Sequence, residues 1–222
     1  MMAVGHTIHG RFRDRRDAGQ QLAALLDPST SSQDFIVLAM PRGGVPVAYQ
    51  VATALAAPLD VFLVRKLGVP GREELALGAL ASGGVRVLND EVLAGLSLPP
   101  AVVAEVTARE MAELERRERL YREGRPPLAL EGRAVLLVDD GVATGASASA
   151  AITALRQRAV RAVTLAVPVG PPSTLTWLAS QVDELVCLLM PEPFFAVGSW
   201  YVDFGETTDD EVCRLLATAQ HA

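Results

Sequence analysis

The sequence has 222 residues, half of them apolar, and a formal net charge of −6. This length suits one α/β core and leaves little room for a second full domain. The acidic balance argues against a general binder of nucleic acid or of membrane surfaces, because both carry phosphate charge. Two distant cysteines, Cys187 and Cys213, provide neither a disulfide framework nor a zinc pattern. No apolar run has the length of a signal peptide or membrane span, so the cytoplasm is the expected location.

In chain order, residues 13–26 have the apolar spacing of an amphipathic helix, which we expect to lie outside the main sheet. Residues 35–40 predict a buried strand that leads into Pro41-Arg42-Gly43-Gly44 and an apolar helix to about residue 56. Paired glycines let a backbone approach a ligand closely, and Arg42 adds a cation. The segment predicts an anion-binding loop at a strand end. The alternative is a glycine turn with a solvated arginine.

A second basic pair, Arg65 and Lys66, ends the next predicted strand at residues 59–64, and Lys66 is the only lysine in the chain. Residues 67–84 are rich in glycine and lack steady periodicity, which predicts a lid or a disordered segment before a strand at 85–88. The alternative for this basic pair is plain solvation. The charged segment 99–124 predicts a solvated connecting helix, with a subunit contact, and hence a homodimer, as the alternative.

The stretch from Ala134 to Ser149 carries the strongest chemical signal. A buried strand at 135–138 ends in Asp139 and Asp140, and a glycine turn with two hydroxyl side chains then opens a helix that ends near residue 158. Amide groups at a helix N-terminus bind phosphate, whereas carboxylates suit sugar hydroxyls or Mg²⁺. The pattern predicts a site for a ribose phosphate. The alternatives are a Mg²⁺ site of another α/β protein and a helix N-cap.

A strand at 160–169, a helix at 173–181 and a strand at 185–190 continue the alternation, which predicts an α/β fold with a mostly parallel twisted sheet flanked by helices. Five of the eleven aromatic residues then gather within 194–204. Aromatic faces stack well on a heterocyclic base. Simple packing of a cap over the sheet is the alternative.

These motifs resemble those of the type I phosphoribosyltransferases. VLLVDDGVATGAS looks like the motif that binds phosphoribosyl pyrophosphate (PRPP), with Gly141 in place of its usual apolar residue, and PRGGVPVA looks like the pyrophosphate loop. RKLGVPG is similar to the mobile-loop segment of the adenine-specific members, and the segment from Phe195 to Asp203 resembles, with one extra residue, the base-binding segment of the hypoxanthine-guanine enzymes. The resemblance implies a single phosphoribosyltransferase domain over 1–222, with a core at about 33–190 and a small hood from about 1–30 and 191–222.

The implied activity is Mg²⁺-dependent transfer of the 5-phosphoribosyl group from PRPP to a nitrogenous, purine-like base, with release of pyrophosphate. The implied catalytic residues are Lys66, Asp139 and Asp140. The implied PRPP-binding residues are Arg42, Gly43, Gly44, Arg65, Lys66, Asp139, Asp140, Gly141, Val142, Ala143, Thr144, Gly145, Ala146 and Ser147. The implied base-binding residues are Phe195, Val197, Trp200 and Tyr201, and the implied metal ligands are Asp139, Asp140 and Asp203. Ala143 stands where the hypoxanthine-guanine enzymes carry an acid, which leaves Glu73 or Glu74 as the candidate general base.

Two other functions fit the same motifs. A regulator of this fold would bind PRPP and Mg²⁺ as a sensor and release no pyrophosphate with any base. An unrelated Mg²⁺-dependent phosphohydrolase would use Asp139 as a nucleophile, so that Asp139→Asn would abolish phosphatase turnover.

Overall fold

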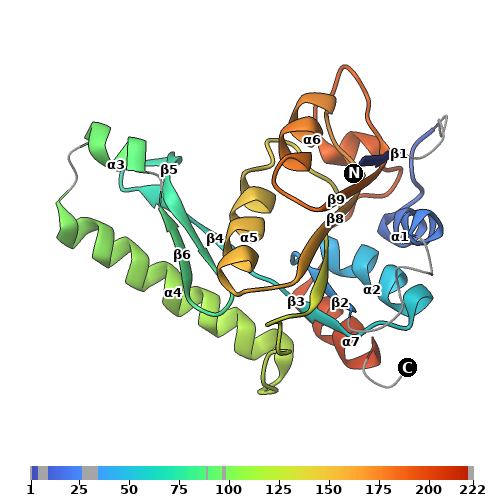
Figure 1. The fold of residues 1–222 in the computed structure, drawn as a ribbon, viewed down its shortest axis with the longest axis horizontal. Coiled ribbons are helices and arrows are strands. Elements are labelled where there is room, and N and C mark those ends of the chain that lie inside the picture. Colours follow the sequence, from blue (N-terminus) through green and yellow to red (C-terminus); the bar gives the residue numbers. More distant parts are fainter. Residues whose placement is uncertain (1, 5–9, 27–34, 89, 97–98, 220–222) are drawn as a thin grey trace.

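The computed structural model describes residues 2–4, 10–26, 35–88, 90–96 and 99–219. Its larger sheet has six strands in the order β1-β9-β8-β7-β2-β3, and every neighbouring pair is parallel (Figure 1). The strands are β1 (Met2–Val4), β2 (Phe35–Ala39), β3 (Leu59–Val61), β7 (Ala134–Val138), β8 (Ala162–Val169) and β9 (Glu184–Leu189). The α/β fold with a mostly parallel sheet is confirmed.

Helices cover both faces of this sheet, which explains why its strands are apolar throughout. Along β7, Leu136 and Val138 pack in one hydrophobic core, and Val135 and Leu137 pack in another. Successive side chains of a strand point to opposite faces, so each strand serves both cores. The first core also contains residues of α1 (Arg15–Leu25), α2 (Gly44–Leu55) and α7 (Asp209–Ala219). The second contains residues of α5 (Ala146–Gln157) and α6 (Pro172–Ala179).

The two ends of the chain come together beside the sheet. The Phe12 amide donates to the Trp200 carbonyl at 2.9 Å, and the Phe12 carbonyl accepts from the Val202 amide at 2.8 Å. The segments predicted to form the hood therefore meet at residues 12–13 and 200–203. Two elements absent from our sequence predictions belong to the main body instead: β1 extends the sheet beside β9, and α7 packs on α2.

A second, antiparallel sheet projects to one side of the main body (Figure 1). It consists of β4 (Val64–Val69), β5 (Arg72–Ala81) and β6 (Val85–Leu88), and helices α3 (Asp90–Leu96) and α4 (Pro100–Arg122) follow it. We call these five elements the arm. The irregular connection predicted at 67–84 is therefore wrong, because the segment forms a hairpin, whereas its role as a lid stays a prediction. Register shifts around Gly68 and a φ of 157° at Gly78 interrupt the apolar alternation that would have revealed the hairpin.

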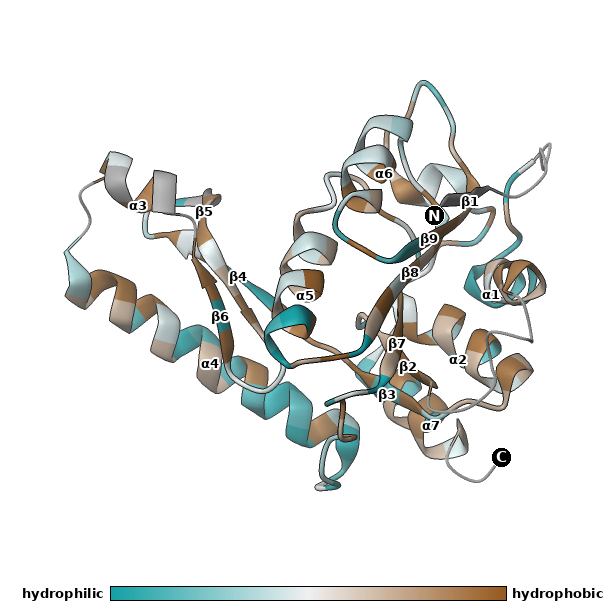
Figure 2. Ribbon diagram, in the orientation of Figure 1, coloured by the Kyte–Doolittle hydropathy of each residue, from teal (hydrophilic) through white to brown (hydrophobic). Residues whose placement is uncertain are grey.

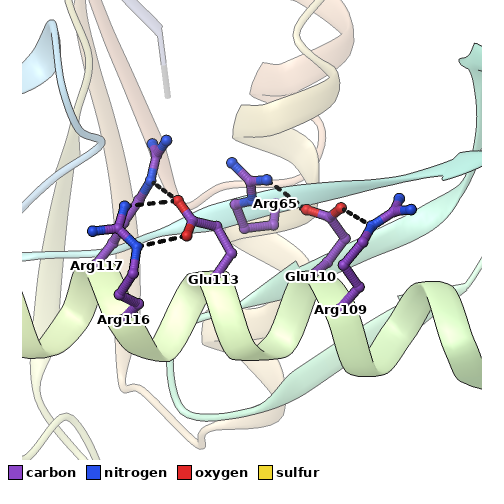
Figure 3. Close-up of polar contacts among 6 residues, drawn as sticks. All are labelled: Arg65, Arg109, Glu110, Glu113, Arg116 and Arg117. Atoms are coloured by element: carbon purple, nitrogen blue, oxygen red, sulfur yellow. Dashed lines mark hydrogen bonds and ion pairs between the residues drawn. The ribbon is translucent and has the colours of Figure 1, made fainter.

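Helix α4 is more than a solvated connection. Its residues Val106 and Leu114 are buried, and the helix packs against β4 and β5. Its charged residues gather toward the C-terminal half, where Figure 2 shows a hydrophilic stretch. Figure 3 shows that Glu113 accepts hydrogen bonds from Arg116 and Arg117, which lower the pKa of this carboxyl to about 2.

Within the described ranges, none of the helices combines the length and the apolar character needed to cross a membrane.

Candidate active site

Two loops at the carboxyl ends of neighbouring strands form the site. Strands β2 and β7 pair as far as their last residues, Ala39 opposite Val138. The Met40 amide continues the pairing by donating to the Val138 carbonyl at 2.9 Å. Residues 41–44, whose Pro41–Arg42 peptide is cis, therefore lie beside residues 139–147. Open α/β sheets bind ligands at such adjoining carboxyl ends.

The two glycines of the first loop allow it to pack tightly against the second. A Cβ atom on Gly43 would lie 2.0 Å from Asp140 Oδ2, and one on Gly44 would lie 2.8 Å from the Val138 carbonyl oxygen. Neither position has room for a side chain. We predicted these glycines from their approach to a ligand, and the structure shows a further requirement: they accommodate the acid that follows β7.

The second loop presents unpaired backbone amides at the start of the 12-residue helix α5. Gly145 turns the chain with a φ of +75°, and Thr174 and Trp177 leave no room for a Cβ there. In the described part of the chain, several amides of this loop donate to no protein acceptor: Ala143, Thr144, Gly145, Ser147 and Ala148. We call residues 143–148 the amide loop. The Thr144 and Ser147 side chains are exposed beside these amides.

Two predicted members of this loop are structural. Val142 is buried, and its amide donates to the Val169 carbonyl at 2.9 Å, so this amide is not available to a ligand. Gly141 has a φ of +155°, and a Cβ there would lie 2.6 Å from Val197 Cγ1. Glycine thus replaces the motif's usual apolar residue because the segment after the acids packs directly against residue 197.

The acid pair lies between the strand end and the amide loop. Burial raises the pKa of Asp139 well above its usual range, and the negative charge of Asp140 raises it further. Burial also raises the pKa of Asp140, although its hydrogen bond with Arg15 opposes that shift. The Asp140 amide donates to Asp139 Oδ1 at 2.8 Å. Hydrogen-bond donors or a cation from a ligand would relieve this desolvated negative charge.

Arg15 is a site residue that our sequence analysis missed. Its Nε donates to Asp140 Oδ2 at 2.7 Å, and its Nη1 donates to the Gly205 carbonyl at 2.6 Å. The guanidinium carbon lies 3.9 Å from the centre of the Phe204 ring, and the side chain is only 13% exposed. The residue opens α1, 125 positions before its acid partner. The helical pattern of residues 13–26 predicted the helix, and no local signal assigned this arginine to the site.

Tyr201 also holds the acid pair in place. Its hydroxyl donates to the Asp140 carbonyl at 2.6 Å, and its ring contacts Phe12 and Phe204. The ring is 2% exposed, and burial raises the pKa of the phenol. A ring packed in this way has no free face, so base stacking by Tyr201 is contradicted.

The other predicted base-binding residues differ in exposure. Phe195 is 84% exposed and can offer its ring to a ligand. Val197 and Trp200 lie in the short 3₁₀ helix η2 (Val197–Trp200) and pack against the first core. The buried Trp200 Nε1 has no hydrogen-bond partner among the described residues. The aromatic segment therefore combines one exposed ring with residues that fasten it to the sheet.

Arg42 stands at the site and reaches toward the C-terminal segment. Its Nη2 forms an ion pair with Glu206, and its Nη1 lies 3.9 Å from Asp209 Oδ1. Both acids precede or begin α7, an element absent from our sequence predictions. An anion that binds Arg42 must therefore compete with carboxylates of the protein.

The basic pair on β4 is divided between the two faces of the arm. Arg65 donates to Glu110 of α4 from Nε at 3.0 Å and from Nη2 at 2.5 Å (Figure 3). Lys66, the next residue of β4, lines a cavity of about 490 Å³ with Ser147 and Trp177. Neighbouring strand residues face opposite ways, which agrees with the different surroundings of these two side chains. Arg65 is thus engaged by Glu110 in this structure, and the PRPP contacts of Arg65 and Lys66 both stay predictions.

The predicted three-acid metal site is not assembled. Asp203 is exposed, and its Oδ1 accepts from the Gly205 amide at 3.0 Å. In the ranges that the structure describes, no three His, Cys, Asp or Glu side chains come close enough together to hold a metal ion. The prediction of Asp203 as the third ligand is therefore wrong for this conformation.

Comparison with known proteins supports the motif assignment. The chain is 50% identical over 208 residues to two Mycobacterium tuberculosis proteins, "Putative phosphoribosyl transferase MT0597" of strain CDC 1551 / Oshkosh and "Putative phosphoribosyl transferase Rv0571c" of strain H37Rv. The match covers 94% of this chain and 47% of each relative, so the chain spans about half their length.

A solved structure shares both fold and sequence. The crystal structure of TT1426 from Thermus thermophilus matches with a TM-score of 0.82 and 46% identity, over 94% of this chain and 98% of that one. The family model for the phosphoribosyl transferase domain matches residues 15–194, a range that contains Arg15, the acid pair and the amide loop. The chain belongs to the phosphoribosyl transferase domain family.

Proposed function

We propose that this protein is a phosphoribosyltransferase that transfers the 5-phosphoribosyl group from PRPP to a nitrogenous base, with a purine-like base favoured, and releases pyrophosphate. Family membership supports an enzyme of the pentosyltransferase type. The observation that carries the proposal is the placement of two desolvated carboxylates shortly before the amide loop, in which five amides have no acceptor among the described residues. Hydroxyl acceptors and an anion cradle so close together suit the two ends of one ribose phosphate.

Each part of the site has a role in this reaction. Asp139 and Asp140 accept hydrogen bonds from the ribose hydroxyls, and the amide loop holds the 5′-phosphate. Arg42 stabilises the pyrophosphate once its own carboxylate partners give way. Phe195 offers an exposed ring to the base. Displacement at C1 breaks the bond to pyrophosphate and forms one to a base nitrogen, so the protein contributes mainly position and charge.

The residues at the site fit a magnesium ion that takes most of its ligands from the substrate. The two carboxylates carry excess, desolvated negative charge, which a cation relieves, yet Asp140 already has one oxygen on Arg15. Asp139 and Asp140 would thus supply the protein's share of oxygen ligands through the oxygens that also accept the ribose hydroxyls, because each carboxylate oxygen has two lone pairs. When bound, Mg²⁺ neutralises charge on the departing pyrophosphate. A cytoplasmic location and a homodimer remain predictions.

One observation favours the regulatory alternative. On the leaving-group side of the site, two of the three predicted cations are engaged by the protein: Arg65 is bound to α4, and Arg42 is paired with acids of the C-terminal segment. Lys66 is the third. A protein that binds PRPP without releasing pyrophosphate needs the acid pair and the amide loop but little help for a leaving group.

A screen of nucleobases with PRPP and Mg²⁺ for pyrophosphate release, beside calorimetric PRPP binding, tests the proposal. Release with at least one base supports the transferase, and PRPP binding without release from any base supports the regulator. The double variant Thr144→Ala and Ser147→Ala should bind PRPP more weakly, whereas Thr176→Ala, an exposed hydroxyl on α6, serves as the matched control. A wild-type protein that does not bind PRPP at all excludes both functions.

A further inference from the structure

Arg15 links three parts of the molecule that are far apart in the sequence. It begins α1, its Nε binds the Asp140 carboxylate, and its Nη1 binds the carbonyl of Gly205. The flat guanidinium also lies over the Phe204 ring. One largely buried side chain thus joins the acid pair to the C-terminal segment at 201–205.

We infer that Arg15 is a positioning residue: it orients Asp140 so that the acid pair receives the two hydroxyls of a ribose, and it couples this pair to the segment at 201–205. The inference rests on the proposed function, because it assigns the acid pair to the sugar. Arg15 is no catalytic residue in this account, since it acts through Asp140.

The hydrogen bonds of the acid pair occupy one oxygen of each carboxylate and leave the other oxygen to accept from a ligand. Asp139 Oδ1 accepts the Asp140 amide, and Asp140 Oδ2 accepts Arg15 Nε. Apart from the backbone amide of Asp140, no donor among the described residues is bound to Asp139 Oδ2 or Asp140 Oδ1. Two such acceptors match two neighbouring hydroxyl donors of a sugar, one for each acid. A deoxy sugar would leave one of these desolvated acceptors without a donor.

The Asp140 carboxylate is only 14% exposed and belongs to the residue directly after Asp139, so the charge of Arg15 offsets the repulsion between the two carboxylates. Arg42, the other arginine at the site, is paired with Glu206 and Asp209. Without Arg15, the Asp140 carboxylate would lose its only side-chain donor in the described structure and could rotate away from Asp139.

Coupling to the C-terminal segment follows from two independent contacts. Arg15 holds the Asp140 side chain and the Gly205 carbonyl, while the Tyr201 hydroxyl holds the Asp140 backbone carbonyl. A shift of the segment at 201–205 is therefore transmitted to Asp140 through both its side chain and its main chain. A lysine could replace the charge, but its single ammonium lacks the rigid, planar fork that spans both acceptors.

The test compares Arg15→Met and Arg15→Lys with Arg16→Met, which removes the same charge from the next, exposed position of α1. We expect Arg15→Met to weaken PRPP binding by about 10- to 100-fold and Arg15→Lys to weaken it less. Arg16→Met should leave the affinity for PRPP unchanged. Binding of inorganic pyrophosphate alone should stay within about twofold in all three variants, because Arg15 acts on the sugar side of the site.

Amide hydrogen exchange provides a readout that needs no ligand. In Arg15→Met, exchange should become faster in the segments at 139–142 and 201–205 together, and in neither with Arg16→Met. Unchanged PRPP binding in Arg15→Met, or an equal loss of PRPP and pyrophosphate binding, would overturn the positioning role. If the wild type binds neither ligand, the proposed function fails, and exchange alone decides: faster exchange in both segments supports the coupling, and faster exchange confined to α1 refutes it.

Discussion

Replacing Gly43 with alanine tests whether Asp140 must keep its observed position. Gly43 has a φ of −60° and a ψ of −33°, which alanine adopts without backbone strain. The added Cβ would lie 2.0 Å from Asp140 Oδ2, 2.7 Å from Asp140 Cγ and 3.2 Å from Arg15 Nε. The substitution therefore acts almost entirely by pushing the carboxylate out of its place beside the guanidinium.

The expected magnitudes follow from the bonds that must break. A hydrogen bond between charged groups contributes about 1.5–3 kcal/mol, and partial exposure of the Arg15–Asp140 pair reduces this to about 1–2 kcal/mol of stability. For a chain of this size, that loss lowers Tm by roughly 2–8 °C. Loss of one charge-assisted bond to a ribose hydroxyl should weaken PRPP binding by about 10- to 150-fold.

Thermal unfolding and calorimetric titration with PRPP measure the two effects. Gly95→Ala is the control, because no heavy atom lies within 4 Å of a Cβ added at this helical glycine. We expect Gly95→Ala to retain wild-type PRPP affinity. If Gly43→Ala binds PRPP as tightly as the wild type, Asp140 does not need its observed position and the assigned ribose contact is wrong.

Three further predictions concern charges around the site and in the arm. Glu206→Gln should tighten binding of inorganic pyrophosphate by about two- to fivefold in calorimetry, because it frees Arg42 from an exposed ion pair. Arg122→Met should lower the free energy of unfolding in urea by about 3–5 kcal/mol, because it leaves buried Asp60 without its cation. Folding raises the pKa of Asp139 above its ordinary value of 3.8. Ionisation of this carboxyl in the unfolded chain therefore lowers the free energy of unfolding as pH rises from about 4 toward the raised pKa of the folded state. Asp139→Asn should therefore stabilise the ligand-free protein at about pH 7, with a gain that shrinks toward about pH 4, while PRPP binding is lost.

Matched variants separate these effects from general loss of charge. Asp210→Asn removes an exposed acid of α7 and should not change pyrophosphate affinity; an equal gain in both variants would point to overall charge instead of release of one arginine. Arg119→Met removes an exposed arginine one turn before Arg122 and should cost little stability. An Asp139→Asn protein whose stability relative to the wild type is independent of pH would contradict a raised pKa.

Local sequence patterns were sufficient to predict the parallel sheet and the central motif at residues 134–149. A strand buried on both faces is apolar at every position, as in residues 135–138, and the two acids and glycines follow it directly in the chain. The C-terminal helix had a local signal that we did not use: Thr208 accepts the Glu211 amide at its Oγ1 at 3.1 Å, in the spacing of an N-terminal cap. The sheet of the arm was not predicted for a different reason. Register shifts and Gly78 disrupt the alternation of apolar and polar residues that is typical of a strand.

The sequence by itself identified the segment that we propose as the binding site for a ribose phosphate, since strand, acids, turn and helix start are consecutive and need no distant partner. Only the tertiary structure decided which side chains complete that site. It brought Arg15 to Asp140 across 125 positions and turned Arg65 toward α4, and it placed Tyr201 under the acid pair. Such contacts depend on how helices pack and on which face of a strand a residue occupies, and neither leaves a periodic trace near the residue in the sequence.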